Sequence, residues 1–204
     1  MRAVRERPTL VLLPGSRRAE VKYLLAPFRE TVARVAAHVP GLQCVLPLVP
    51  GVAARVRAGC ADWPVPLHFV ESDNDKFAAF DASDAALAAS GTVATELAVA
   101  GCPMIVGYRM GSLTVAIWRR LIKVKYATIA NLVLDRMAVP EFLQENLKPE
   151  AMAESLVRLL TDPQAAADQR ADLARAARAL GIDDLRPAAR AAERVLAVIA
   201  ARKT

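Results

Sequence analysis

Two short segments of the chain combine small, hydroxyl-bearing and charged residues in a way that suits phosphate binding. The first begins at Leu13 and reads Leu-Pro-Gly-Ser-Arg-Arg-Ala-Glu. Gly15 permits a sharp turn with exposed amides, Ser16 can cap a following helix, and Arg17 offers a fork of donors for phosphate oxygens. The same residues also make an ordinary capped turn with a surface arginine, so this segment alone leaves both interpretations open.

The second segment begins at Ala88 and reads Ala-Ala-Ser-Gly-Thr-Val-Ala-Thr-Glu. Small residues let a ligand approach the backbone, and the amides of Gly91 and Thr92 with the hydroxyls of Ser90 and Thr92 could hold a diphosphate. Glu96 lies one helical turn further on and could accept hydrogen bonds from a ribose diol, as acidic residues do in dinucleotide folds. The alternative is a capping box in which this glutamate only closes the helix end.

Three further segments carry polar groups of less certain purpose. Arg109, in Gly-Tyr-Arg-Met, faces either a substrate phosphate, the other side of a cleft or a surface carboxylate. Residues 118–126 interleave basic and apolar side chains, which suits either an anionic membrane surface or an amphipathic helix packed on a sheet. A loop-rich stretch after the sheet offers ligands or simple caps at Asn131, Arg136, Glu141 and Gln144.

The elements that would position these segments alternate along the chain. Short apolar runs bounded by Pro, Gly or small residues predict buried strands at 9–13, 42–48, 66–70, 85–89 and 103–107. Apolar residues spaced by three and four predict a helix at 17–38, and further helices are predicted at 52–58, 75–82, 91–100 and 112–121, the last of them amphipathic. This order predicts an α/β fold, a Rossmann-like doubly wound parallel sheet with both phosphate-type loops at its carboxyl edge.

The chain is predicted to be one domain, 1–204. Its residues 150–204 read as a helical C-terminal tail, with helices at 150–160, 164–180 and 187–203. Apolar residues make up 54% of the chain and charged residues 24%, which is a globular composition. No uncharged apolar run is long enough to span a membrane, so export and membrane insertion are both poorly supported.

Charge and cysteine usage narrow the partners and the compartment. The net charge of +6 favours anionic partners without choosing among phosphorylated molecules, anionic lipid and nucleic acid. The three cysteines, Cys44, Cys60 and Cys102, lack metal-site spacing, and no other cluster predicts a metal. Their number and apolar surroundings favour a reducing, cytoplasmic compartment.

Taken together, four runs closely resemble lipid-A-disaccharide synthases over about residues 10 to 160: LLPGSRRAEV, QCVLPLV, SDAALAASGTVATELAVAGCPMIVGYRM and RRLIKVKYATIANLVLDRMAVPEFLQENL. The ASGTxxxE pattern alone would indicate only the wider class of nucleotide-sugar transferases with two facing Rossmann-like domains, the GT-B type. The GYRM run and the NL…R…PEFLQ tail narrow the resemblance to this family.

The resemblance implies the transfer of diacylglucosamine from UDP-diacylglucosamine to diacylglucosamine phosphate. The products are the lipid A disaccharide and UDP, the anomeric centre inverts, and no metal or cofactor is needed. It implies that the diphosphate is held by Gly15, Ser16, Arg17, Ser90, Gly91 and Thr92, and the ribose by Glu96. Uracil would lie by Phe69, Val70 and Glu71, and the donor sugar or the interdomain cleft by Arg109, Asn131, Arg136 and Gln144.

Members of the family carry a whole N-terminal domain before the first of these strands, whereas only nine residues precede Leu10 here. That domain is expected to hold the acceptor, much of the lipid and the general base, so this chain alone is expected to bind UDP without turnover. The implied partners are the two lipid-linked sugars, the missing domain or a partner half, and the inner face of the inner membrane. A homodimer stays open, and the implied location is cytoplasmic and peripheral to the membrane.

Two other functions compete with this one. A UDP-sugar epimerase of the same two-domain architecture would need catalytic carboxylates across the cleft. A non-catalytic module that binds anionic lipid is allowed by the net charge. Nucleic acid is not an expected partner, because the sequence lacks a DNA-reading motif and does not interleave Lys and Arg with aromatic residues as single-strand binding surfaces do.

Overall fold

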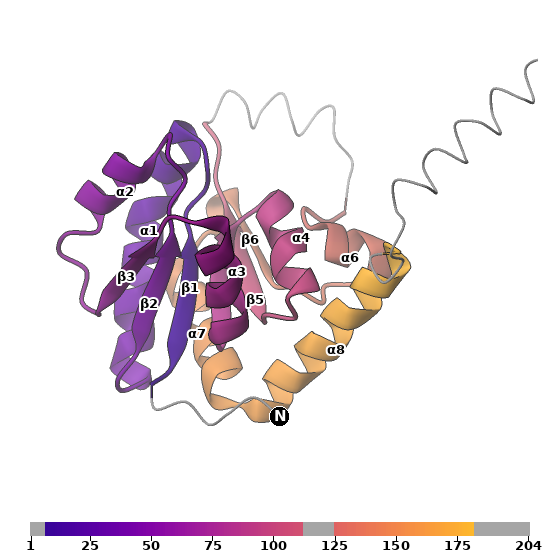
Figure 1. Cartoon of the computed structure of the whole chain (residues 1–204). Helices are drawn as coiled ribbons and strands as arrows, with labels where there is room; N and C mark the ends of the chain where they lie inside the picture. Colours follow the sequence, from indigo (N-terminus) through magenta and orange to yellow (C-terminus); the bar gives the residue numbers. More distant parts are fainter. Residues whose placement is uncertain (1–6, 112–124, 182–204) are drawn as a thin grey trace, which may run out of the picture.

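The computed structural model describes residues 7–111 and 125–181, so the helices predicted at 112–121 and 187–203 lie outside the described residues. Its centre is a parallel six-stranded sheet in the order β3-β2-β1-β4-β5-β6 (Figure 1). The strands are β1 (Thr9–Leu13), β2 (Gln43–Pro47), β3 (Leu67–Val70), β4 (Ala85–Ala89), β5 (Met104–Tyr108) and β6 (Glu141–Leu143). This arrangement confirms the predicted Rossmann-like sheet, with its switch in strand order between β1 and β4.

Helices cover both faces of the sheet. They are α1 (Arg18–His38), α2 (Ala53–Gly59), α3 (Asp73–Ala82), α4 (Thr92–Val99), α6 (Ile129–Leu134), α7 (Pro149–Thr161) and α8 (Pro163–Ala179), with a short 3₁₀ turn at Gln144–Asn146. Buried residues of α1, α2 and α7 form the core of one face, and those of α3, α4, α6 and α8 form the core of the other. No helix in these ranges is long and apolar enough to cross a bilayer.

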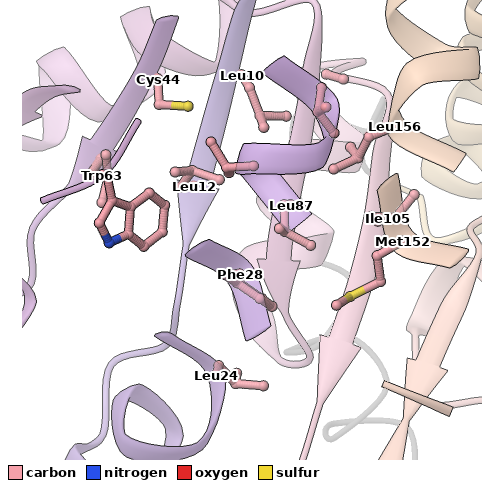
Figure 2. Packing of buried hydrophobic residues seen from close by; sticks show 14 of the residues in the cluster. Leu10, Leu12, Leu24, Phe28, Cys44, Trp63, Leu87, Ile105, Met152 and Leu156 are labelled. Carbon is pink, nitrogen blue, oxygen red and sulfur yellow. The ribbon is translucent and has the colours of Figure 1, made fainter. Parts of the chain in front are cut away.

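Alternation along the strands produces the two cores. In β1, Leu10 and Leu12 face the α1 side, whereas Val11 and Leu13 face the α4 side. The first core gathers large side chains from helices and strands around Phe28, as Figure 2 shows. Alanines are frequent in the second core, and β4, which is buried along its whole length, contributes Ala86 and Ala88 to it, whereas Ala85, Leu87 and Ala89 face the first core. Small side chains on β4 let α4 lie close to the sheet.

The helices α7 and α8, which fall in the segment predicted as a helical C-terminal tail, pack against the two faces of the sheet. The helix α7 contacts α1, β4 and β5 on one face, whereas α8 contacts α4 and α6 on the other (Figure 1). Gln169 of α8 is buried, accepts from the Met104 amide at 2.6 Å and donates to the carbonyls of Met104 and Ala138 at 3.0 and 3.1 Å. The sequence predicts these helices but does not show which face each one covers.

The stretch predicted as loop-rich contains a helix and the sixth strand. The helix α6 has six residues and β6 has three, so neither is long enough to show a clear periodicity. The strand forms because the exposed edge of β5 offers backbone partners: Val106 pairs with Glu141 and Tyr108 with Leu143. Pairing with an existing edge, rather than local propensity, decides this element.

Candidate functional site

A cavity of about 550 Å³ opens at the carboxyl ends of the central strands. It lies at the switch point between β1 and β4, where open α/β sheets bind their ligands, and its volume is that of a small-molecule site. Both phosphate-type loops line it. Of the residues selected from the sequence, the cavity brings together Gly15, Ser16, Arg17, Val70, Glu71, Ser90, Gly91, Thr92 and Glu96.

The first loop carries its own anion. Glu20 is buried, and its carboxylate accepts hydrogen bonds from the amides of Ser16 and Arg17 at 2.9 and 3.2 Å and from the Arg17 guanidinium at 3.1 Å. Glu20 thus supplies the glutamate half of a capping box at the start of α1, with Arg17 rather than Ser16 as the N-cap residue. Gly15 has a φ of 107°, and a Cβ there would lie 2.5 Å from the Glu20 carboxylate. The amides of this loop are therefore occupied by the protein itself.

The second loop is open toward the cavity. Gly91 is the N-cap residue of α4 with a φ of 149°, and no side chain in the described ranges caps the helix. A Cβ on Gly91 would meet no described atom within 4 Å. Ser90 turns its hydroxyl toward the Ala127 carbonyl at 3.4 Å, which ties the loop to the segment before α6. Uncapped amides and the positive end of the helix dipole favour an anion here more than at the first loop.

The helix α3 forms a third wall that carries a cation. The Nζ atom of Lys76 lies 3.2 Å from Glu96 Oε2 and 3.2 Å from Asp73 Oδ1. Burial alone would lower the pKa of Lys76, but the hydrogen bonds and negative charges of Glu96 and Asp73 outweigh it and raise that pKa above its ordinary value. Glu96 therefore faces the cavity as one half of an ion pair, not as an isolated carboxylate.

The three residues predicted to lie by uracil do not all line the cavity. Val70 and Glu71 line the cavity, whereas Phe69 packs against the core beside α1. The Arg57 guanidinium lies 4.6 Å from the centroid of the Phe69 ring and pairs with Glu71 at 2.6 Å. Strand alternation separates Phe69 from Val70, because adjacent residues of β3 point to opposite faces, and Glu71 follows the end of the strand.

Four residues selected for the donor sugar or the cleft lie elsewhere. Arg109 donates to the Gln144 carbonyl at 3.2 Å, and the Gln144 side chain accepts from the Met110 amide at 3.3 Å. Arg136 pairs with Asp172 of α8, which also pairs with Arg175. None of these described residues lines the cavity.

The fourth, Asn131, is fully buried. Its side-chain oxygen accepts from the amides of Ala138 and Val139, both at 2.8 Å. Its side-chain nitrogen donates to the Val139 carbonyl and to Glu141, both at 2.7 Å. The Asn131 side chain therefore joins α6 to β6. It is fully buried and exposes no polar group to a sugar.

Three charged cavity residues, Glu20, Asp73 and Lys76, are missing from the sequence-based selection. Glu20 had a usable signal, because it follows Arg17 by three residues, the spacing of a capping box. Lys76 had none. It sits in an unremarkable Asp-Asn-Asp-Lys run, and only the crossover from β3 into α3 brings it to Glu96, twenty positions further along the chain.

Solved structures share this fold. MurG of Acinetobacter baumannii matches 82% of this chain and 46% of its own, with a TM-score of 0.53 and 20% identity. WaaG, a glycosyltransferase involved in lipopolysaccharide biosynthesis, matches 83% of this chain and 42% of its own, with a TM-score of 0.53 and 18% identity. With the cavity at the strand-order switch, these similarities show that the chain has the Rossmann-like α/β fold that forms part of these proteins.

The particular family follows from sequence. A family model described as lipid-A-disaccharide synthetase matches residues 2–195. The lipid-A-disaccharide synthase of Rhodospirillum centenum is 47% identical over 95% of this chain and 48% of its own length. That of Bradyrhizobium diazoefficiens is 40% identical over 95% of this chain and 50% of its own. The chain belongs to the lipid-A-disaccharide synthase family and spans about half the length of these relatives.

Proposed function

We propose that the chain is the UDP-binding half of a lipid-A-disaccharide synthase, an inverting glycosyltransferase. The reaction would move diacylglucosamine from UDP-diacylglucosamine to diacylglucosamine phosphate and release UDP. The observation that carries the proposal is the single cavity shared by Arg17, the uncapped start of α4 and Glu96. Family membership supplies the identity of the sugars.

Within that cavity each group has a chemical task. The diphosphate would lie against the amides at Gly91 and Thr92, where the helix dipole stabilises negative charge. Arg17 would add a charge-assisted hydrogen bond from its exposed side chain. Glu96 would accept from the ribose, and Val70 with Glu71 would lie beside the base. These donors also stabilise the UDP leaving group as the bond to the sugar breaks, because negative charge develops on the diphosphate.

The acceptor hydroxyl needs a general base within hydrogen-bond reach. We assign that base, the acceptor site and the lipid contacts to the remainder of the family's length, which the relatives carry and this chain does not match. Either substrate carries acyl chains, so the assembled enzyme would work at the cytoplasmic surface of the inner membrane. The cleft of the assembled enzyme would lie between this half and that remainder.

Calorimetric titration of the 204-residue chain with UDP tests the nucleotide site. The chain is expected to bind UDP, and Arg17→Ala is expected to lower the affinity by about tenfold or more, since it removes a charge-assisted hydrogen bond. Arg29→Ala is the matched control, because Arg29 is exposed, pairs with Asp62 and lies outside the cavity. An Arg17→Ala chain with the affinity of the control would remove this arginine from the site.

A product assay separates binding from turnover. With both lipid-linked sugars present, the chain alone is expected to release no UDP, and a chain supplemented with the family's N-terminal domain is expected to form the disaccharide. The absence of UDP binding at millimolar concentration would count against the whole proposal. An epimerase would instead interconvert the UDP-sugar in the absence of any acceptor, so the same assay without acceptor decides between the two activities.

A further inference from the structure

In the described part of the chain, Lys76 is the cavity residue of α3 that forms an ion pair with α4. Its ammonium pairs with Glu96 and Asp73 and lies 4.6 Å from the centroid of the Phe77 ring. The Lys76 side chain is 23% exposed, compared with 36% for Glu96 and 88% for Asp73. Of the three side chains Lys76 is the most buried, and of its two carboxylate partners Glu96 is the more buried.

The contact selects one oxygen of the Glu96 carboxylate. The ammonium lies against Oε2, which leaves Oε1 available to accept from a ligand. An unrestrained glutamate would have to give up rotamer freedom when a ligand binds, and that loss weakens binding. A glutamate already fixed by an ion pair avoids much of this loss. The pair also separates Glu96 from the negative charge of Asp73.

We propose that Lys76 is a positioning residue that fixes Glu96 for recognition of the ribose diol. In this role Lys76 sets the preference of the site for ribonucleoside diphosphates over analogues that lack both ribose hydroxyls. The inference rests on the proposed UDP site and extends it by naming the group that determines sugar selectivity. If Lys76 instead contacted the diphosphate directly, it would change the affinity for the ribonucleotide and for the dideoxy analogue equally.

The test compares dissociation constants for UDP and 2′,3′-dideoxyuridine diphosphate. The parent chain is expected to prefer UDP by about tenfold or more, because a hydrogen bond from each hydroxyl to a charged acceptor is lost in the analogue. Lys76→Met is expected to reduce this preference to about threefold or less. Lys22→Met is the matched control, since Lys22 is an exposed lysine of α1 that lies outside the cavity, and it is expected to retain the parent preference.

A double-mutant comparison keeps the test independent of general damage to the site. In a Glu96→Gln background the charged acceptor is already lost, so adding Lys76→Met is expected to leave the remaining preference unchanged. Lys76→Arg, which keeps the cation, is expected to retain most of the parent preference.

Three outcomes have distinct meanings. A Lys76→Met chain that keeps the parent ratio overturns the positioning role, even if its affinity for both nucleotides falls together. A parent chain that binds UDP but shows no preference over the dideoxy analogue also overturns it and leaves the UDP site standing. A parent chain that does not bind UDP contradicts the proposed function itself.

Discussion

At the scale of single residues, the two phosphate-type loops have different capacities. Glu20 satisfies the amides of Ser16 and Arg17, so an incoming anion would have to displace a carboxylate that already holds three hydrogen bonds. The loop at Gly91 has no such internal partner among the described side chains. We therefore expect the diphosphate to bind mainly at α4, with Arg17 reaching it from the side.

The first loop depends on a glycine. Gly15→Ala is expected to lower the free energy of unfolding by about 1–3 kcal/mol, because its φ of 107° strains any other residue and the new Cβ would meet the Glu20 carboxylate at 2.5 Å. Urea denaturation measures the change. Gly51→Ala is the matched control, because its Cβ would meet no atom of the described residues within 4 Å, and its effect is expected to stay within about 1 kcal/mol. Equal stabilities of the two variants would contradict the described loop geometry.

At the scale of elements, buried polar side chains join segments that the apolar pattern does not connect. Asn131 holds the turn between α6 and β6, and Gln169 holds α8 to the start of β5. Glu141 adds a second tie, since it accepts from the amides of Ala127 and Thr128 at 2.8 Å. These contacts satisfy backbone groups that would otherwise be buried without partners.

The Asn131 contacts predict a large stability effect. Asn131→Ala is expected to lower the free energy of unfolding by about 3 kcal/mol, because it leaves two backbone amides and a carbonyl without their buried partner. Leu132→Ala, at the next position of the same helix and 44% exposed, is expected to change it by less than about 1 kcal/mol. Unfolding midpoints that match between these variants would show that the asparagine is not structural.

At the scale of the whole molecule, helix placement decides which groups water can reach. All three cysteines are buried: Cys44 and Cys60 beneath α1 and α2, and Cys102 on the opposite face. Burial raises the pKa of Cys44, and the nearby Cys60 adds to the shift. Burial and the charge of Asp62 raise the pKa of Cys60 to about 11.

Thiol labelling checks this arrangement. A raised pKa leaves less thiolate at a given pH, so at pH 8 only about one Cys60 in a thousand would be ionised, and the thiolate is the reactive form. The folded chain is expected to react slowly with a disulfide reagent, and the chain in denaturant is expected to yield three thiols at once. Rapid labelling of even one cysteine in the folded chain would contradict the packing described.

Much of this protein can be read from its sequence, because local patterns determine local structure. The apolar run from Thr9 to Leu13 and the Ser-Gly-Thr turn at Ser90 mark a strand and a strand-to-helix turn without any distant contact. Strands that alternate with helices form a parallel sheet with short, right-handed connections. The loops that follow β1 and β4 therefore lie at the same edge of the sheet. The cavity residues of both loops could therefore be selected in advance.

The tertiary structure alone decided which polar side chains face that cavity. Phe69 and Val70 are neighbours in the sequence, yet the sheet separates them to opposite faces. Asn131 has the composition of a ligand residue, but α6 and β6 enclose it. Lys76 reaches Glu96 only because β4, the strand between α3 and α4, brings these two helices together. Burial and long-range pairing are properties of the packed chain, and a linear pattern does not contain them.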